Sequence, residues 1–247
     1  MTSERDVVDV GAALAQSFTR LGSVGDQAFD QIYEDRWRRA SSCYWTPVAV
    51  AMRASAWFEE HGGRRVLDIG SGAGKACIVG ALCSRLTFVG IEQREELVSV
   101  AQRAAVALGV ADRASFVRGT IASFDTSPFD CIYLFNPFAE NLFFEDLWLD
   151  DTVELSESRF RSDVRTVEQI LDASPTGTKL VTYHGFGGRI PDGFAPMRSA
   201  AMGDDWLRLW EKQTRRRTGY YVETGDAFEH FHDPDDGPEA DVPGRLR

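Results

Sequence analysis

Short apolar runs alternate with longer amphipathic segments through the middle of the chain. The first apolar run, Arg65–Gly70, ends at a glycine and has the length of a strand. Strands that alternate with helices are typical of a parallel sheet covered by helices on both sides, so we expect an α/β fold. The expected strands are 65–70, 86–92, 114–119, 129–136 and 178–184, and the expected helices are 75–84, 95–108 and 158–171.

The first 60 residues carry a helical pattern instead. Asp6–Leu21 and Asp26–Ala40 are amphipathic at helical spacing. Thr46-Pro47 predicts the start of a third helix, with Thr as the N-cap and Pro at the first helical position, that ends near Glu60. We interpret residues 1–60 as an N-terminal helical cap on the sheet.

The pattern changes again toward the other end. Residues 207–213 alternate apolar and polar side chains, and residues 219–224 form a second short run. Together they predict a C-terminal antiparallel hairpin at the sheet edge, with a helix over Asp204–Lys212 as the alternative. Residues 233–247 are rich in Asp, Pro and Gly, which predicts a disordered acidic tail and leaves 61–232 as the main domain.

Length and charge exclude some classes of function. A chain of 247 residues can bury a large core without a disulfide or a metal to support it. The formal net charge is −11, but residues 223–241 hold eight acids and no Lys or Arg, so the rest carries only −3. Such a nearly neutral body lacks the broad basic surface of a duplex nucleic-acid binder. A nucleic-acid partner is therefore not expected.

Cysteine usage and hydropathy favour a cytoplasmic protein. The four cysteines form no C-x-x-C pair and no zinc spacing, so no metal is expected. Cys77, Cys83 and Cys131 lie in apolar surroundings, and we interpret them as buried thiols in a reducing compartment. The first residues are too polar for a secretory signal, and no apolar run approaches the ~18 residues of a membrane span.

The sharpest motif is a glycine loop, Gly70-Ser71-Gly72-Ala73-Gly74, between an expected strand and an expected helix. Glycines allow a tight turn and a close approach of ligand to backbone, and the N–H groups at the start of the helix face that ligand. Glu92 ends the next expected strand, where its carboxylate can accept hydrogen bonds from two ribose hydroxyls. The alternative is a tight turn without a ligand.

Two nucleotide-binding motifs compete for the glycine loop. A P-loop needs a hydroxyl residue after Gly74-Lys75, but Ala76 follows, so nothing there would hold Mg²⁺. A dinucleotide site has the spacing G-x-G-x-x-G, which this loop lacks. Asp68, two residues before the first glycine, would repel a pyrophosphate and attract an ammonium group. The charge favours a ligand with an amino-acid end.

The segments VLDIGSGAGK, GIE and DCIYLFNPF resemble the class I S-adenosylmethionine (SAM)-dependent methyltransferases, over roughly residues 45–225. The resemblance implies a Rossmann-like, doubly wound sheet and SAM as cofactor. It places the methionine end near the glycine loop, the ribose at Glu92 and the adenine beside Gln93. Thr120 stands where the family often has an adenine-binding Asp. The cofactor-binding candidates are Thr46, Asp68, Gly70, Ser71, Gly72, Glu92, Gln93, Thr120, Ile121 and Asn136.

Asn136-Pro137-Phe138 follows the fourth expected strand, at the edge of the sheet where parallel strands bind ligands. The tripeptide is similar to the [DN]PP[YF] motif of amino-group methyltransferases, from which it lacks one Pro, and to the Asn-Asn-Phe of the non-SET histone-lysine methyltransferases. The resemblance implies that the carboxamide of Asn136 accepts a hydrogen bond from an amine and so acts in catalysis. The alternative is a turn after a strand.

Tyr44-Trp45-Thr46 lies just before the third N-terminal helix. A similarly placed loop closes over the cofactor in the isoaspartyl methyltransferases, which implies that Tyr44 is a second catalytic candidate; an aromatic anchor with a helix cap is the alternative. Weaker candidates are Lys75, which we interpret as a solvated residue or a contact for a phosphate-like group rather than a catalyst, and His184, a structural histidine or a general base. His230 and His232 beside Asp233 suggest either a metal site or a solvated segment.

These observations predict a methyltransferase that moves the methyl group of SAM to a nucleophile on a protein or small-molecule acceptor. A neutral amine needs alignment and an acceptor for its proton, whereas a hydroxyl needs a general base. Asn136 favours nitrogen. A non-catalytic SAM-binding or scaffold protein is the alternative, and the acceptor and the oligomeric state stay open.

Overall fold

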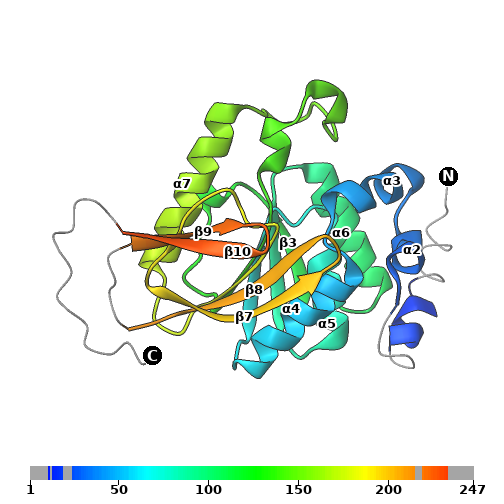
Figure 1. Cartoon of the computed structure of the whole chain (residues 1–247). Helices are drawn as coiled ribbons and strands as arrows, with labels where there is room; N and C mark the ends of the chain where they lie inside the picture. The colour runs from blue at the N-terminus through cyan, green and yellow to red at the C-terminus, as the bar shows by residue number, and fades with distance from the viewer. Residues whose placement is uncertain (1–10, 12, 19–23, 215–218, 233–247) are drawn as a thin grey trace.

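The computed structural model of the chain describes residues 11, 13–18, 24–214 and 219–232 (Figure 1). Its centre is a seven-stranded sheet in the order β3-β2-β1-β4-β5-β8-β7, in which the first five strands run parallel. Each parallel strand lies within the range expected for it, so the α/β prediction is confirmed. These strands are β1 Arg65–Ile69, β2 Thr87–Glu92, β3 Ala114–Arg118, β4 Cys131–Phe135 and β5 Lys179–Tyr183.

Helices cover both faces of the sheet, as doubly wound folds require. The helices are α4 Val48–Glu60, α5 Lys75–Cys83, α6 Glu95–Ala107 and α7 Glu157–Ala173, with short 3₁₀ turns η2 Ile121–Ser123, η3 Ala139–Leu142 and η4 Glu145–Leu147. Successive residues of a strand point to opposite faces of the sheet. Val66 therefore packs in the hydrophobic cluster that contains residues of helices α4, α5 and α6, and Leu67 packs in the cluster on the other face, which contains residues of helix α7. Two cores therefore lie on the two faces of one sheet.

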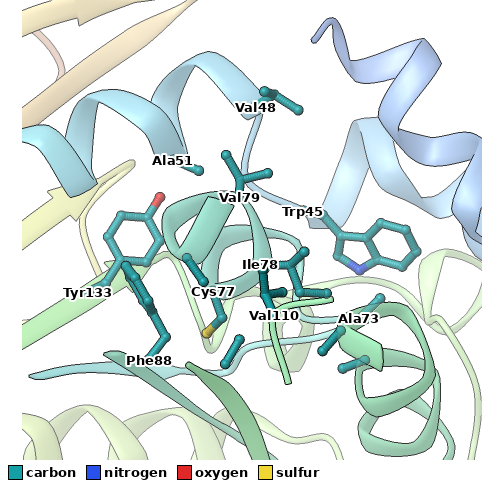
Figure 2. Close-up of a cluster of buried hydrophobic side chains, with 14 of the residues drawn as sticks. Trp45, Val48, Ala51, Ala73, Cys77, Ile78, Val79, Phe88, Val110 and Tyr133 are labelled. Carbon is teal, nitrogen blue, oxygen red and sulfur yellow. The ribbon is translucent and has the colours of Figure 1, made fainter. Parts of the chain in front are cut away.

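Figure 2 shows part of the first core, between α4, α5 and the sheet. Tyr133 of β4 and Phe88 of β2 lie below the helices, and Trp45 lies beside Ala73 of the glycine loop. Cys77 and Cys131 are buried as predicted, whereas Cys83 is exposed because it is the last residue of α5. The first core thus reaches the loop that carries the glycine motif.

The C-terminal strands pair differently from the predicted hairpin. β8 (Asp205–Lys212) is a strand, so the alternative helix is wrong, and it pairs antiparallel with β5 and with β7 (Phe194–Met202). β9 (Gly219–Thr224) joins a second, three-stranded sheet in the order β10-β9-β6, with β10 at Ala227–His232 and β6 at Ile190–Pro191. Arg208, buried on β8, bonds Glu223 and the carbonyls of Gly225 and Ala227, which connects the second sheet to the first.

The N-terminal part is helical but more broken than predicted. The single helix expected over Asp26–Ala40 is instead α2 Asp26–Phe29, η1 Asp30–Ile32 and α3 Asp35–Tyr44, with extended backbone at Tyr33. The break lets the Tyr33 hydroxyl donate a hydrogen bond to the carbonyl of Ala73. Residues 13–18 are also helical, but most of the helix expected over Asp6–Leu21 lies outside the described residues.

α4 begins at Val48, one residue later than predicted, and its cap differs. The N–H group of Val48 donates to the carboxylate of Asp26, so an acid from another helix satisfies it. Thr46 does not cap the helix, because its hydroxyl bonds that of Tyr133 at 3.1 Å.

The expected acidic tail, 233–247, lies outside the described residues. Across the described ranges, no helix combines the length and the apolar character needed to cross a membrane.

Candidate active site

An open cavity lies at the carboxyl ends of β1, β2, β4 and β5, and its volume, mouth included, is about 1170 Å³. Parallel strands place the residues that follow them along one edge of the sheet, which is why distant segments meet here. The structure brings most of the sequence candidates to this cavity: Tyr44, Gly70, Gly72, Glu92, Gln93, Thr120, Ile121 and Asn136 line it, whereas Thr46, Asp68 and Ser71 do not.

The glycine loop forms the wall of the cavity between β1 and α5. Gly70 has a φ of +76° and Gly72 a φ of +53°, and residues other than glycine rarely adopt this backbone region. A Cβ atom on Gly70 would lie 2.8 Å from Cβ of Pro137, and one on Gly72 would lie 3.1 Å from the Trp45 ring. Both glycines are therefore required where the loop meets its neighbours, with or without a ligand.

Glu92 ends β2 and lies buried at the cavity wall. One carboxylate oxygen accepts the N–H of Gly72 at 3.1 Å, and the other accepts the N–H of Arg94 at 2.9 Å. Burial raises the pKa of Glu92, and the amide donors oppose that rise. Since a carboxylate has about four acceptor positions, these amides leave room for hydroxyl groups of a ligand.

Asp68 and Ser71 lie behind the cavity wall. The Asp68 carboxyl is buried and accepts a hydrogen bond from the Cys77 thiol at 3.3 Å. Burial raises its pKa to about 7, and no described residue supplies a cation to pair with it. The Ser71 hydroxyl is buried without a hydrogen-bond partner among the described residues. β1 therefore carries an uncompensated acid, and the glycine loop an unused hydroxyl, behind the wall.

Asn136 and His184 are the described residues other than glycine with positive φ, at 39° and 57°. They follow the neighbouring strands β4 and β5, and both line the cavity. The backbone N–H of Asn136 donates to the carbonyl of Gly185 at 2.9 Å, while its carboxamide bonds no described residue. Strained backbone at a ligand cavity is a frequent mark of a functional site.

His184 makes a carboxylate contact that sequence analysis did not foresee. Its Nδ1 lies 2.6 Å from Oδ2 of Asp205, and its Nε2 lies 3.7 Å from Oδ1 of the exposed Asp204. The Tyr183 and Phe135 rings lie against the imidazole. An acid at Nδ1 fixes the tautomer in which Nε2 can accept a proton.

Tyr44 lines the cavity, and its hydroxyl donates to the carbonyl of Leu147. Burial raises its pKa to about 12, so it stays protonated at neutral pH.

Lys75 was interpreted as solvated, which is wrong: it is buried, with Nζ 2.6 Å from Asp26 and 2.7 Å from Asp30. The paired acids of the N-terminal part offset the cost of burying this charge.

Arg94 is a cavity residue that sequence analysis missed. Its buried guanidinium pairs with Glu140 at 2.9 Å and with Asp150 at 2.8 Å, and so joins β2 to the segment after β4. Arg159 and Asp163 of α7 form a further pair at 2.7 Å that lines the cavity. In the sequence these residues look like ordinary surface charges.

His230 of β10 lies 2.9 Å from Asp192, so it is not merely solvated. Among the described residues, no group of three or more His, Cys, Asp or Glu side chains is arranged to hold a metal ion.

Comparison with known proteins indicates which reaction the cavity supports. Residues 60–170 match the model of a family described as a methyltransferase domain. Over these residues the chain is similar to a methyltransferase domain, and the similarity supports SAM-dependent methyl transfer. The matched range begins before β1 and ends within α7, so it includes the glycine loop, Glu92 and Asn136. The match favours an enzyme over the non-catalytic alternative, with SAM as its cofactor.

Several solved structures are similar to the chain at low sequence identity, and no curated protein matches it. An RNA methyltransferase from Salinibacter ruber, in complex with S-adenosyl-L-homocysteine, is 22% identical with a TM-score of 0.50, over 70% of this chain and 95% of that one. A putative O-methyltransferase from Klebsiella pneumoniae is 13% identical, with a TM-score of 0.49, over 83% and 90%. TrmN from Thermus thermophilus is 20% identical, with a TM-score of 0.46, over 68% of this chain and 49% of TrmN.

The first of these likenesses shows a shared fold. The mostly parallel, Rossmann-like sheet predicted from the sequence is thereby confirmed.

Proposed function

We propose that the cavity holds SAM along the ends of β1 and β2 and presents an amine acceptor at the end of β4. The observation that carries the proposal is the unpartnered carboxamide of Asn136, held by strained backbone in the same cavity as Glu92. SAM, when bound, supplies an activated methyl group and its own leaving group. The chain therefore has to bind, align and deprotonate.

The residues of the cavity fit the parts of the cofactor. Glu92 has acceptor positions left for ribose hydroxyls, and Gln93, Thr120 and Ile121 line the adjoining wall for the adenine. The methionine end lies at the glycine loop, where the uncompensated carboxyl of Asp68 attracts an ammonium group. Ser71 adds an unused hydroxyl in the same loop.

Asn136 serves the acceptor. Its carboxamide oxygen accepts a hydrogen bond from the amine and turns the nitrogen lone pair toward the methyl group, as the likeness of Asn136-Pro137-Phe138 to amino-group methyltransferases implies. Phe138 and Tyr44 border the acceptor side of the cavity. The pair of His184 and Asp205 supports removal of the proton that the amine gives up.

The cofactor assignment is tested by titrating SAM and S-adenosylhomocysteine into the protein by calorimetry, with EDTA present. Glu92→Ala is expected to weaken binding by about 1.5–3 kcal/mol, because two ribose hydroxyls lose a charged acceptor. Glu95→Ala is the matched control, since that acid lies exposed at the start of α6. Unchanged affinity in a folded Glu92→Ala variant would refute the ribose contact, and no binding by the wild type would refute the cofactor site.

SAM affinity should also depend on pH through Asp68. The pKa of this carboxyl in the free protein is about 7, and a bound ammonium group favours the ionised form. Binding below pH 7 must therefore displace a proton, so affinity should fall by up to about tenfold per pH unit as the pH drops, and level off above pH 7.

The titratable groups that act on Asp68 are Cys77 and Glu92, and Asp68 in turn raises the pKa of the buried Tyr133 hydroxyl. The Asp68→Asn variant distinguishes the titration of Asp68 from the titration of these other groups. Its SAM affinity should be weaker than that of the wild type at pH 8 and should hardly change between pH 6 and 8. A wild-type affinity that does not change over this range would show that no ammonium group meets Asp68.

A further inference from the structure

The segment between β4 and α7 borders the cavity and exposes large apolar side chains. Leu142, Phe144 and Leu147 are 54%, 80% and 55% exposed, while their neighbours Glu140, Asn141 and Phe143 line the cavity. In Figure 1 this segment, drawn in green, projects beyond the sheet near the start of α7. We call residues 139–156 the ledge. Exposed apolar clusters beside a ligand cavity mark surfaces that bind a partner.

Three sets of contacts hold the ledge in place: those of Arg94, those within the ledge and that of Tyr44. Arg94 pairs with Glu140 and Asp150, at the two ends of the exposed stretch. Within the ledge, the N–H of Leu149 donates to Glu140, and the indole N–H of Trp148 donates to the carbonyl of Phe143 at 3.1 Å. The Tyr44 hydroxyl binds the ledge from α3. The apolar side chains are thus held in place facing solvent.

The charge of the ledge indicates what covers it. Residues 137–158 contain seven acids and no Lys, Arg or His. Arg94 neutralises two of them, and Arg161 pairs with Glu157. The remaining four have no cationic partner among the described residues, and they flank the apolar side chains in sequence: Glu145, Asp146, Asp151 and Glu154.

We propose that the ledge docks a cationic polypeptide segment that carries apolar side chains next to Lys or Arg, and that this segment belongs to the acceptor. The inference rests on the proposed function, because it assumes that the neighbouring amine enters the cavity at Asn136. Apolar contact supplies affinity, and the unpaired acids select a basic partner. A polypeptide is favoured over a small cation, because the exposed side chains lie outside the set that lines the cavity.

Charge disfavours the other occupants of such a surface. A second copy of the chain would bring two acidic ledges together, and the whole chain has a net charge of −11. The phosphates of a nucleic acid or of an anionic membrane would meet the same unpaired carboxylates. Each of these occupants is an outcome that the experiment below can detect.

The probe is a fluorescein-labelled peptide of about 20 alternating Lys and Leu residues, titrated by fluorescence anisotropy at low salt. Phe144→Ser combined with Leu147→Ser should weaken its binding at least about tenfold, since two large apolar contacts are lost. Val106→Ser is the matched control, because Val106 is 67% exposed on α6, away from the ledge. Glu145→Gln combined with Asp146→Asn should weaken binding severalfold, and Asp112→Asn should not.

Peptide chemistry and SAM titration complete the test. A peptide with Glu in place of Lys should not bind, and one with Ser in place of Leu should lose sensitivity to Phe144→Ser. Equal binding of the Lys/Leu peptide by ledge and control variants would overturn the proposal, as would Phe144-dependent dimerisation or Phe144-dependent binding of phosphatidylglycerol vesicles or single-stranded DNA. Ledge variants should keep SAM affinity, so a failure of the cofactor site is detected separately in the wild type.

Discussion

Replacing Asn136 with alanine is expected to lower the rate of methyl transfer about 10²–10³-fold, by analogy with the loss of one preorganised polar group in other active sites. SAM affinity should change little, because the proposed ribose and methionine contacts come from the ends of β1 and β2, whereas Asn136 follows β4. The measurement is incorporation of labelled methyl groups into a cell extract, alongside calorimetric titration of SAM.

The backbone of Asn136 allows a sharper control than alanine alone. Its φ of 39° strains an alanine at this position, whereas glycine adopts this region freely. Asn136→Gly should therefore be more stable than Asn136→Ala by roughly 1 kcal/mol, yet equally poor in methyl transfer, because both variants lack the carboxamide.

If Asn136 only shapes the turn before Pro137, the outcome differs. Asn136→Gly would then keep near-normal transfer, and Asn136→Ala would lose stability and SAM affinity together. Thermal melting and SAM titration of both variants distinguish these cases without knowledge of the natural acceptor.

The parallel part of the fold was predictable because its signals are local. Each buried strand is an apolar run of a few residues closed by a polar or glycine residue, and Glu92 and Asn136 are two of those closing residues. Once the strands are taken as parallel, their carboxyl ends must share one edge. That the two side chains line one cavity therefore follows from the sequence pattern and the topology.

The parts that were missed depend on contacts between distant segments. Arg94 binds acids 46 and 56 residues further along the chain, and nothing near it in the sequence marks it as buried. β7 gives no alternating pattern because it is an edge strand whose side chains are mostly exposed, with an irregularity between Pro196 and Arg198. The same absence of a local signal led β8 to be paired with β9 instead of β7.

Lys75→Met is expected to reduce the free energy of unfolding by about 3–5 kcal/mol, because removal of one partner leaves buried charge unpaired. Lys75 is only 2% exposed at the start of α5, and the Asp30 side chain beside it is 9% exposed. Nζ also donates to the Ser41 hydroxyl at 3.1 Å. This one cation joins the N-terminal helices to the helix that follows the glycine loop. Urea unfolding followed by circular dichroism measures the loss.

A second substitution separates the unpaired acid from the lost packing. Lys75→Met combined with Asp30→Leu removes both charges of the buried pair, and much of the lost stability should return, since apolar residues of similar volume often replace buried ion pairs without cost. Asp26 can stay, because its side chain is 47% exposed and it still accepts the N–H of Val48.

Arg85→Met, on a side chain that is 96% exposed, should change stability by less than about 0.5 kcal/mol. If Lys75→Met cost no more than Arg85→Met, the N-terminal helices would not be held by this cation. If the double variant stayed as unstable as the single one, the cost would lie in packing rather than in the uncompensated carboxylate.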